Sequence, residues 1–407
     1  MRSLAGIAAL LAVAWCLSED RWRVPWRTVA GGVALQAALA LLLIGFPPAT
    51  RAVLLLNDAA DALQRATDEG TRFVFGYLVG APLPFLESHP GAAFILAFKA
   101  LPLVLVISAL AALLLHWGIL QRVTATFAWL LRRALGIGGA LALGAAVHVF
   151  VGMIEAPLLV RPWLARMQRG ELFALMTCGM AGIAGTVMVI YAAILGPVIP
   201  NALGQLLIAS LVSTPAALAM AALMVPFTAG APAAQIVNAH PSASWVDAVV
   251  RGTIDGIPVL TGIIAVLLVT ISLVALVNMT LGLLWFPVTL QSLFAIPFRP
   301  IMWLIGIPWA QTEAAAALMA DKTVLNEFVA YLHLAGPAGE TLSPASRLIM
   351  TFALCGFANF GSLGILIGGL GAMVPERRAE VVSLGFRSLV SGTLATCSSA
   401  ALAGVLQ

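Results

Sequence analysis

Residues 257–287 read IPVLTGIIAVLLVTISLVALVNMTLGLLWFP and contain no charged side chain. A helix that crosses the hydrocarbon core of a bilayer needs about 20 predominantly apolar residues, so this run is long enough to span a membrane. The whole chain is similar, because 61% of its 407 residues are hydrophobic and only 9% are charged, against roughly 25% charged residues in soluble domains. The sequence therefore predicts an all-α polytopic membrane protein whose solvent is the lipid bilayer.

Apolar stretches of this kind recur along the chain. They lie at residues 4–18, 29–47, 92–116, 171–196, 203–226, 344–371 and 379–405, which together with 257–287 predict about eight transmembrane helices. The first stretch has the length of a signal-peptide core, but it ends in Trp15-Cys16-Leu17-Ser18 rather than in a small-x-small cleavage site. We therefore predict a short first membrane helix.

Two moderately apolar segments do not fit this series. Residues 138–164 contain Glu155-Ala156-Pro157, and residues 312–334 contain Asp321-Lys322 and Asn326-Glu327. A full crossing at either place would invert the charge pattern of the connectors that follow. We therefore predict two opposed re-entrant helical hairpins, since broken backbone is tolerated at membrane depth only where protein or a water-filled cavity surrounds it.

Basic residues favour one orientation of the chain. The positive-inside rule places the connectors richest in Lys and Arg in the cytoplasm, so we predict a multi-pass protein of the inner (cytoplasmic) membrane with both termini outside. The predicted cytoplasmic connectors then hold Arg21, Arg23, Arg27, Arg122, Arg132, Arg133, Arg161, Arg166, Arg169, Arg251, Arg377 and Arg378.

The remaining segments connect these spans. Residues 48–91 mix charged and apolar residues at helical spacing, as an interfacial helix would. Residues 228–250 are rich in Ala, Pro, Ser and Asn and predict a cytoplasmic linker. The predicted organisation is an N-terminal region at 1–91, a first repeat at 92–228, a linker at 229–256 and a second repeat at 257–407.

The two halves share one pattern. Each runs from a hairpin with a glutamate, Glu155 or Glu327, to a helix with a Cys-Gly pair, Cys178-Gly179 or Cys355-Gly356, and then to one more crossing. In the predicted orientation the two Cys-Gly helices run in opposite directions, so the repeats are inverted. Inverted repeats with interrupted helices and a site near the midplane are typical of secondary transporters.

Polar side chains inside the predicted membrane segments are the candidate functional groups. An acidic residue at the bilayer centre is costly unless it is paired, protonated or hydrated, so Glu155 and Glu327 are functional candidates. The alternative is a structural pairing of these acids with a nearby base such as Arg161 or Lys322.

Other residues add polar or stacking groups to these segments. Asn326, Asn359 and Ser362 supply donors and acceptors suited to hydroxyl groups, and Phe357 is either a stacking surface or packing. His148 is either a neutral core histidine or a proton carrier near neutral pH.

Several classes of function are disfavoured. The net charge of +4 is small and the basic residues lie in short connectors, so we expect no nucleic-acid partner. The four cysteines show no CxxC or Cys/His ligand spacing, so we expect no metal site of that kind and no cofactor. A channel would show a continuous polar pore face, and an intramembrane enzyme would need a motif such as HExxH, which the chain lacks. We predict that the protein is not an enzyme.

The sequence around the first hairpin resembles a known family. Residues 146–162, AVHVFVGMIEAPLLVRP, are similar to the first-hairpin signature of the concentrative nucleoside transporters, and the resemblance favours bacterial NupC-like nucleoside:cation symporters. Further blocks match in the same order, at 171–176, 322–331, 353–359, 375–378 and 391–394. The resemblance covers nearly the whole chain.

This resemblance implies a fold and a site. It implies eight membrane helices, two re-entrant hairpins, interfacial helices and a homotrimer with one transport path in each protomer. It places the first hairpin against the nucleobase, and the second hairpin and the Phe-Ala-Asn helix against the ribose. The implied substrate-binding residues are Gly152, Met153, Ile154, Glu155, Asn326, Glu327, Phe357, Asn359 and Ser362.

The chain departs from the family pattern at the base contacts. Well-studied members have Gly-Gln-Thr-Glu or Gly-Gln-Ser-Glu where this chain has Gly152-Met153-Ile154-Glu155. Two polar contacts to the base are therefore absent. We predict an altered base preference, in the direction of purines, because discrimination depends on polar groups that the wrong ligand leaves unpaired.

A second departure affects the coupling ion. Sodium-coupled members carry Asn at the position of His148 and Ser or Thr at that of Gly182, and the resemblance places the ion site at His148, Val151, Gly182 and Ile183. Hard cations such as sodium prefer oxygen ligands, so this departure favours protons, although backbone carbonyls could still bind sodium. We predict nucleoside import by symport with a proton or sodium; the alternatives are transport of a related small polar or nucleobase-containing solute with altered base specificity, and an ion-independent facilitator.

Overall fold

The computed structural model describes residues 2–45, 47–79, 95–228, 242–284 and 288–406, and within these residues all regular structure is helical. The N-terminal half contains α1 (Arg2–Cys16), α2 (Trp26–Gly45), α3 (Pro47–Phe75), η1 (Gly76–Val79), α4 (Leu96–Lys99), α5 (Leu103–His116), α6 (Ile119–Leu135), α7 (Gly139–Val147), α8 (Glu155–Leu159), α9 (Arg161–Leu164), α10 (Arg169–Ala181), α11 (Gly185–Leu195) and α12 (Ala202–Met224). The C-terminal half contains α13 (Trp245–Leu284), α14 (Leu290–Leu304), η2 (Trp309–Gln311), α15 (Thr312–Val324), α16 (Glu327–Ala335), α17 (Pro337–Glu340), α18 (Pro344–Leu354), α19 (Phe360–Met373), η3 (Pro375–Arg377) and α20 (Arg378–Val405).

Among the described residues, six helical segments are long and apolar enough to cross a membrane. They are Trp26–Ile44, Leu96–His116, Arg169–Leu195, Ala202–Met224, Trp245–Leu283 and Pro375–Val405. The other two predicted crossings, 4–18 and 344–371, correspond to the shorter apolar helix α1 and to the pair α18 and α19. The prediction of an all-helical membrane protein with several crossings is therefore confirmed.

Both segments that did not fit the series of crossings fold as helical hairpins, with two helical arms joined by a turn. Residues 138–164 form α7, a turn, and the short helices α8 and α9, while residues 312–334 form α15 and α16. Asn326 starts α16, because its side chain accepts a hydrogen bond from the backbone N–H of Val329 at 3.0 Å. A polar cap of this kind satisfies one of the free N–H groups at the start of a helix.

Two predicted connecting segments can be compared with the structure. The linker placed at 229–256 is too long at its C-terminal end, because α13 already begins at Trp245. Asp247 explains the early start, since its carboxylate accepts from the backbone N–H of Ala243 and binds the Arg251 guanidinium one turn later. The segment at 48–91 forms α3 and η1 as far as Val79, and its remainder lies outside the described residues.

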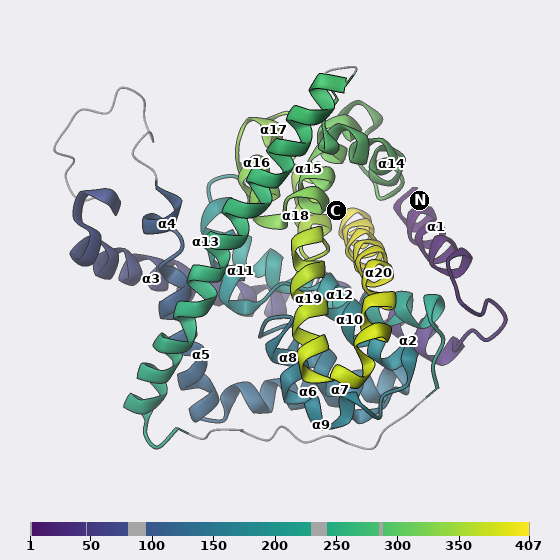
Figure 1. Cartoon of the computed structure of the whole chain (residues 1–407), viewed down its shortest axis with the longest axis horizontal. Helices are drawn as coiled ribbons and strands as arrows, with labels where there is room; N and C mark the ends of the chain where they lie inside the picture. The colour runs from purple at the N-terminus through teal and green to yellow at the C-terminus, as the bar shows by residue number, and fades with distance from the viewer. Residues whose placement is uncertain (1, 46, 80–94, 229–241, 285–287, 407) are drawn as a thin grey trace.

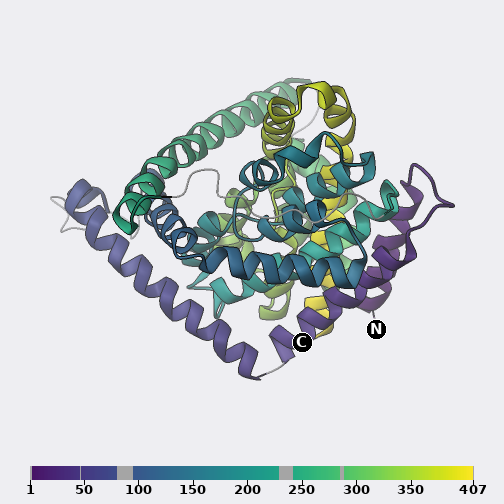
Figure 2. The same ribbon diagram turned by 90° about the horizontal axis from the view of Figure 1, so that it is seen from below.

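The core is built around α12 and α20. In their most apolar stretches 89% and 83% of the residues are buried, against 6% for α13. α12 packs against α2 and α20, whereas α13 lies along α5. Figure 2 shows α3 and α13 as two long helices that run along two adjoining sides of the molecule. The molecule thus consists of a buried helical body and a peripheral frame of α3, α5 and α13.

Both termini lie at the same end of the body. The Arg2 guanidinium donates to the Gly306 carbonyl, and Gly404 packs against the carbonyl of Ile305 (Figure 1).

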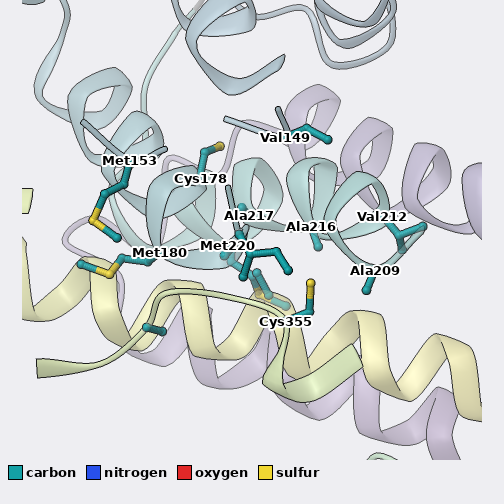
Figure 3. Packing of buried hydrophobic residues seen from close by; sticks show 14 of the residues in the cluster. Val149, Met153, Cys178, Met180, Ala209, Val212, Ala216, Ala217, Met220 and Cys355 are labelled. Atoms are coloured by element: carbon teal, nitrogen blue, oxygen red, sulfur yellow. The ribbon is translucent and has the colours of Figure 1, made fainter. Parts of the chain in front are cut away.

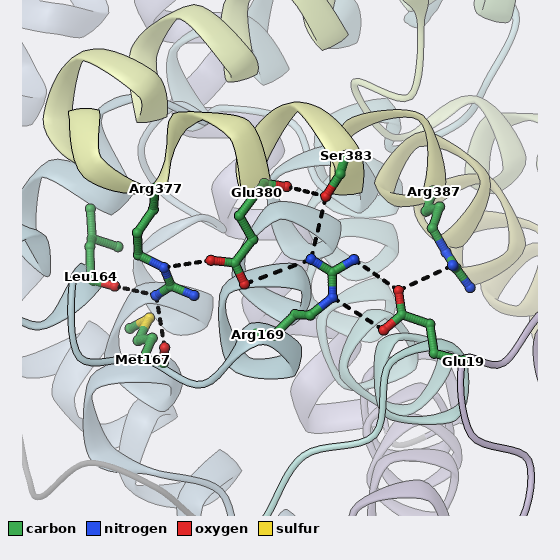
Figure 4. Close-up of polar contacts among 8 residues, drawn as sticks. All are labelled: Glu19, Leu164, Met167, Arg169, Arg377, Glu380, Ser383 and Arg387. Carbon is green, nitrogen blue, oxygen red and sulfur yellow. Dashed lines mark hydrogen bonds and ion pairs between the residues drawn. The ribbon is translucent and has the colours of Figure 1, made fainter.

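A charged network lies at the other end of α20 (Figure 4). The Arg169 guanidinium donates to Glu19 at 2.9 Å and lies 3.8 Å from Glu380, while Arg377 pairs with Glu380 at 2.7 Å and Arg387 with Glu19 at 3.2 Å. The hydrogen bond from Arg169 holds the pKa of Glu19 below its usual range. This pair therefore stabilises the fold above the ordinary carboxyl pKa, and its contribution is lost as the pH falls through the lowered pKa.

Candidate functional site

Two interrupted helices meet at the centre of the molecule. α10 and α11 are separated at residues 182–184, and α18 and α19 at residues 355–359. The backbone N–H of Phe357 in the second break donates to the carbonyl of Gly182 in the first at 3.2 Å. A Cβ atom on Gly356 would lie only 2.8 Å from the Met180 carbonyl oxygen, so glycine is required for this approach.

Glu327 is the best-defined polar group beside these breaks. Its side chain is buried, with 5% of the residue exposed. One carboxylate oxygen accepts from the Tyr191 hydroxyl at 2.7 Å and the other from the Asn359 amide at 2.8 Å. These residues belong to α16, α11 and the start of α19, so three segments far apart in sequence converge on one carboxylate.

Asn359 also determines where α19 starts. Its Oδ1 accepts from the backbone N–H of Ser362 at 2.7 Å, while its Nδ2 donates to Glu327. Ser362 is buried and lies in the first turn of α19, and Asn326 starts α16 in the same manner. The two asparagines thus place two helix N-termini next to Glu327. Phe357 is half-buried in the break that precedes α19.

The glutamate of the first hairpin is less enclosed than Glu327. Glu155 is exposed in the first turn of α8, and its carboxylate lies against Gly152, where a larger residue would collide with it. The alternative considered from the sequence, a structural pairing of Glu155 with Arg161 or of Glu327 with Lys322, is not among the ion pairs of the described residues. Instead, Lys322 donates to the Ala353 carbonyl and to Thr396.

Met153 and Ile154 follow Gly152 at the tip of the first hairpin and pack against neighbouring helices. Met153 is buried, with its Cβ close to Gly179 of α10, and it lies near Met180 in the apolar cluster of Figure 3. Ile154 covers Gly369 of α19, where any side chain would collide with it. The two side chains that replace polar residues of the family pattern thus make apolar contacts with α10 and α19.

The predicted ion-site residues surround the break between α10 and α11. A Cβ atom on Gly182 would lie 3.5 Å from Ser210 Oγ, 3.6 Å from the Cys178 carbonyl oxygen and 3.9 Å from the His148 carbonyl oxygen. The backbone N–H of Gly185 donates to the Phe150 carbonyl at 3.2 Å, which ties the first hairpin to this break. Half-buried Val151 and buried Ile183 follow in the hairpin turn and the break.

Two buried polar atoms in this region have no hydrogen-bond partner within the described part of the chain. They are His148 Nε2 and Ser210 Oγ. The His148 imidazole lies against Gly179, whose added Cβ would be 3.2 Å from the ring. Buried polar atoms are almost always hydrogen-bonded, so an unpaired imidazole nitrogen and hydroxyl favour a bound ion, proton or water at this place.

Sequence reasoning missed two of these residues. Tyr191, one of three tyrosines in the chain, lies within a predicted membrane span, and its isolated hydroxyl was the available signal. Ser210 gave no comparable signal, because serines in membrane helices commonly hydrogen-bond to their own backbone.

Comparisons with known proteins cover nearly the whole chain. Residues 5–78 match the profile described as Na+ dependent nucleoside transporter N-terminus, 97–198 match Nucleoside recognition, and 205–404 match Na+ dependent nucleoside transporter C-terminus. An uncharacterized transporter of Haemophilus influenzae is 36% identical over 100% of this chain and 97% of its own length. The nucleoside permease NupC of Helicobacter pylori is 31% identical over 99% of this chain and 97% of its own.

The chain belongs to the concentrative nucleoside transporter family. The family resemblance of the hairpin motifs is thereby confirmed, and the chain is a cation-coupled nucleoside transporter rather than an enzyme. Its fold matches that of CNTnw in an inward-facing substrate-bound state, with a TM-score of 0.90 and 35% identity over 100% of this chain and 98% of that one. A doubly substituted CNTnw variant in an outward-facing state gives a TM-score of 0.88 over 100% and 97% of the two chains, at 35% identity.

Proposed function

We propose that this concentrative nucleoside transporter imports nucleosides across the cytoplasmic membrane, with the ribose bound beside Glu327. The observation that carries this proposal is the buried carboxylate, which accepts from Tyr191 and Asn359. A carboxylate already held by two neutral donors is a ready acceptor for sugar hydroxyls, since hydrogen bonds to charged groups are the stronger ones. Phe357, Asn326 and Ser362 complete the ribose side.

The base is proposed to face the first hairpin. Gly152, Met153, Ile154 and Glu155 form its tip, and only Glu155 supplies a polar side chain. A site with one acidic group recognises a base through a ring N–H or an exocyclic amine and discriminates poorly among bases that share one. We therefore propose a broadened base preference that includes purines.

The coupling cation is proposed to bind at the break between α10 and α11. The oxygens of Ser210, Cys178 and His148 around Gly182 are of the kind that a hard cation prefers. The His148 imidazole, whose Nε2 is unpartnered, is instead the titratable group through which proton coupling would act. The site therefore suits either cation, and a transport measurement is needed to separate them.

We propose that, during transport, the substrate-carrying part of the protomer moves relative to the rest of it. The hairpins, α10, α11 and α18 to α20 carry the binding groups, while α3, α5 and α13 form the peripheral frame, in which α13 exposes many large apolar side chains. We propose that the two hairpins are re-entrant from opposite faces and that the two halves are inverted repeats.

The frame helices of three protomers are proposed to form a homotrimer. Native mass spectrometry of the purified protein would give three times the protomer mass.

The decisive experiment is uptake of labelled uridine and adenosine into proteoliposomes, with a sodium gradient and a proton gradient imposed separately. Gradient-driven accumulation is expected for at least one nucleoside and identifies the ion. Equilibration without accumulation under both gradients would favour an ion-independent facilitator. No uptake at all by folded, inserted protein would contradict nucleosides as the substrate.

A substitution at the proposed binding carboxylate tests the ribose assignment. Glu327→Gln keeps the shape of the side chain and removes its charge. Uptake of every nucleoside should fall by at least about tenfold, because the charged acceptor for the ribose hydroxyls is lost. A tenfold change corresponds to about 1.4 kcal/mol of binding free energy. Wild-type rates for all nucleosides in this variant would contradict the ribose assignment.

A further inference from the structure

The carbonyl end of α18 is completed by side chains of the second hairpin. An α-helix leaves its last four carbonyl groups without partners inside the helix. In α18 the Thr351 carbonyl accepts from the Tyr331 hydroxyl at 3.0 Å, and the Ala353 carbonyl accepts from Lys322 Nζ at 2.8 Å. The remaining two, Phe352 and Leu354, accept from the backbone N–H groups of Cys355 and Gly356. All four terminal carbonyls are therefore satisfied.

Lys322 is an unusual residue to find in this position. It is completely buried, with 0% exposed, and its ammonium group also donates to Thr396 Oγ1 at 3.2 Å. Among the ion pairs of the described residues, none joins Lys322 to a carboxylate within 4.0 Å. A buried charge is costly without compensation. Here the compensation comes from the negative, carbonyl end of a helix, where cations are favoured.

The corresponding break in the first half has no such side chain. Of the last carbonyls of α10, that of Cys178 accepts from the Gly182 N–H, and within the described part of the chain no hydrogen bond joins a side chain of the first hairpin to the others. His148 lies there with an unpartnered Nε2. The two helix breaks are thus alike in form but differ in their polar groups, since a lysine Nζ lies at one and the carbonyl and hydroxyl oxygens around Gly182 lie at the other.

We propose that Lys322 is a tethered cation that occupies the carbonyl end of α18 and thereby positions the ribose-binding groups. Its ammonium holds the 355–359 break in the geometry from which Asn359 reaches Glu327. Lys322 is a positioning residue, because it acts through that break and does not itself contact the substrate. This inference rests on the proposed ribose site beside Glu327.

The first test is Lys322→Met, which keeps an unbranched side chain and removes the charge. KM for uridine or adenosine should rise about tenfold, a change equivalent to one hydrogen bond to a charged group, while the maximal rate changes less. Lys99→Met, the other lysine of the chain, serves as the matched control and should keep the wild-type KM. A KM within twofold of wild type for Lys322→Met would overturn the proposal.

Chemical rescue separates a cation from mere packing. In Lys322→Ala, tens of millimolar methylammonium should restore part of the lost affinity, and the bulkier tetramethylammonium should not. Failure of methylammonium to lower KM overturns the tethered-cation role. If neither variant folds, Thr396→Val tests the same contact, because it removes one acceptor of the ammonium and should raise KM, and an unchanged KM then overturns the proposal.

The wild-type measurement keeps this inference distinct from the proposed function. Absence of nucleoside uptake by the wild-type protein would refute the function. Uptake by the wild type together with an unchanged KM in Lys322→Met would refute the role of Lys322 alone.

Discussion

At the scale of single residues, the proposed ribose site depends on how the Glu327 carboxylate is held. Glu327 is buried and receives hydrogen bonds from Tyr191 and from Asn359, neither of which carries a charge. Neutral donors orient a carboxylate without neutralising it, so Glu327 keeps capacity to accept from a ligand. Glu155, in contrast, is exposed at the tip of the first hairpin. The two glutamates, similar in sequence context, therefore have different environments.

Tyr191→Phe tests this arrangement. The substitution removes only the hydroxyl that donates to Glu327, and the ring keeps its contacts with Phe328 and Tyr331. We expect nucleoside uptake to lose about tenfold in kcat/KM, because one hydrogen bond to a charged group is lost. Tyr77→Phe, at an exposed tyrosine, should behave as wild type. Wild-type kinetics in Tyr191→Phe would show that the hydroxyl does not orient the carboxylate.

His148→Asn tests the ion site. Asparagine supplies a neutral oxygen where the imidazole now leaves Nε2 unpartnered. We expect sodium stimulation of uptake to appear or increase and proton dependence to decrease, since a hard cation prefers oxygen ligands. The measurement is initial uptake at varied sodium concentration and fixed pH. An unaltered response to both ions would leave His148 as a packing residue.

At the scale of elements, the two helix breaks are held together by small residues and backbone contacts. Phe357 N–H donates to the Gly182 carbonyl, and Gly356 lies directly on the backbone of Met180. Such contacts cannot shift without moving Asn359, which follows in the same break. The position of the proposed ribose site is therefore coupled to the packing of α10 against α18 and α19.

Gly356→Ala should disturb this packing. Its added methyl group would come within 2.8 Å of the Met180 carbonyl oxygen and 2.9 Å of the Thr396 side chain. Overpacking of this kind costs about 1–3 kcal/mol, so we expect a lower Tm and reduced uptake. Gly364→Ala in α19, where no atom lies within 4 Å of the new Cβ, is the control and should not lower Tm. Equal Tm values for the two variants would contradict the close approach.

At the scale of the whole molecule, burial divides the helices into a body and a frame. The most apolar stretch of α13 is 6% buried, whereas that of α12 is 89% buried, although both are long apolar helices. A helix with so little buried surface must face lipid or other protein chains. The position of α13 along α5 at the edge of the molecule (Figure 2) leaves this face available for both.

The orientation of the chain can be tested through its cysteines. Cys16 is exposed at the end of α1, while Cys178, Cys355 and Cys397 are buried. With the termini outside, Cys16 faces the cytoplasm, so a membrane-impermeant maleimide should label inverted vesicles and not intact spheroplasts. A cysteine at exposed Glu313, near the start of α15, should show the reverse pattern in a Cys16→Ala background. Labelling of Cys16 in intact spheroplasts would invert the proposed topology.

The membrane environment, most helical segments, the two helical hairpins and the family could be predicted from the amino-acid sequence. These follow from local composition, because a bilayer selects long apolar runs and each break in a run is visible in the chain. The side chains that pair across distant helices could be identified only in the folded protein. Tyr191 and Glu327 are 136 residues apart, and their contact, like that of Lys322 with the end of α18, depends on how distant helices pack. The same packing turned Met153 and Ile154 toward α10 and α19, which side-chain type alone does not predict.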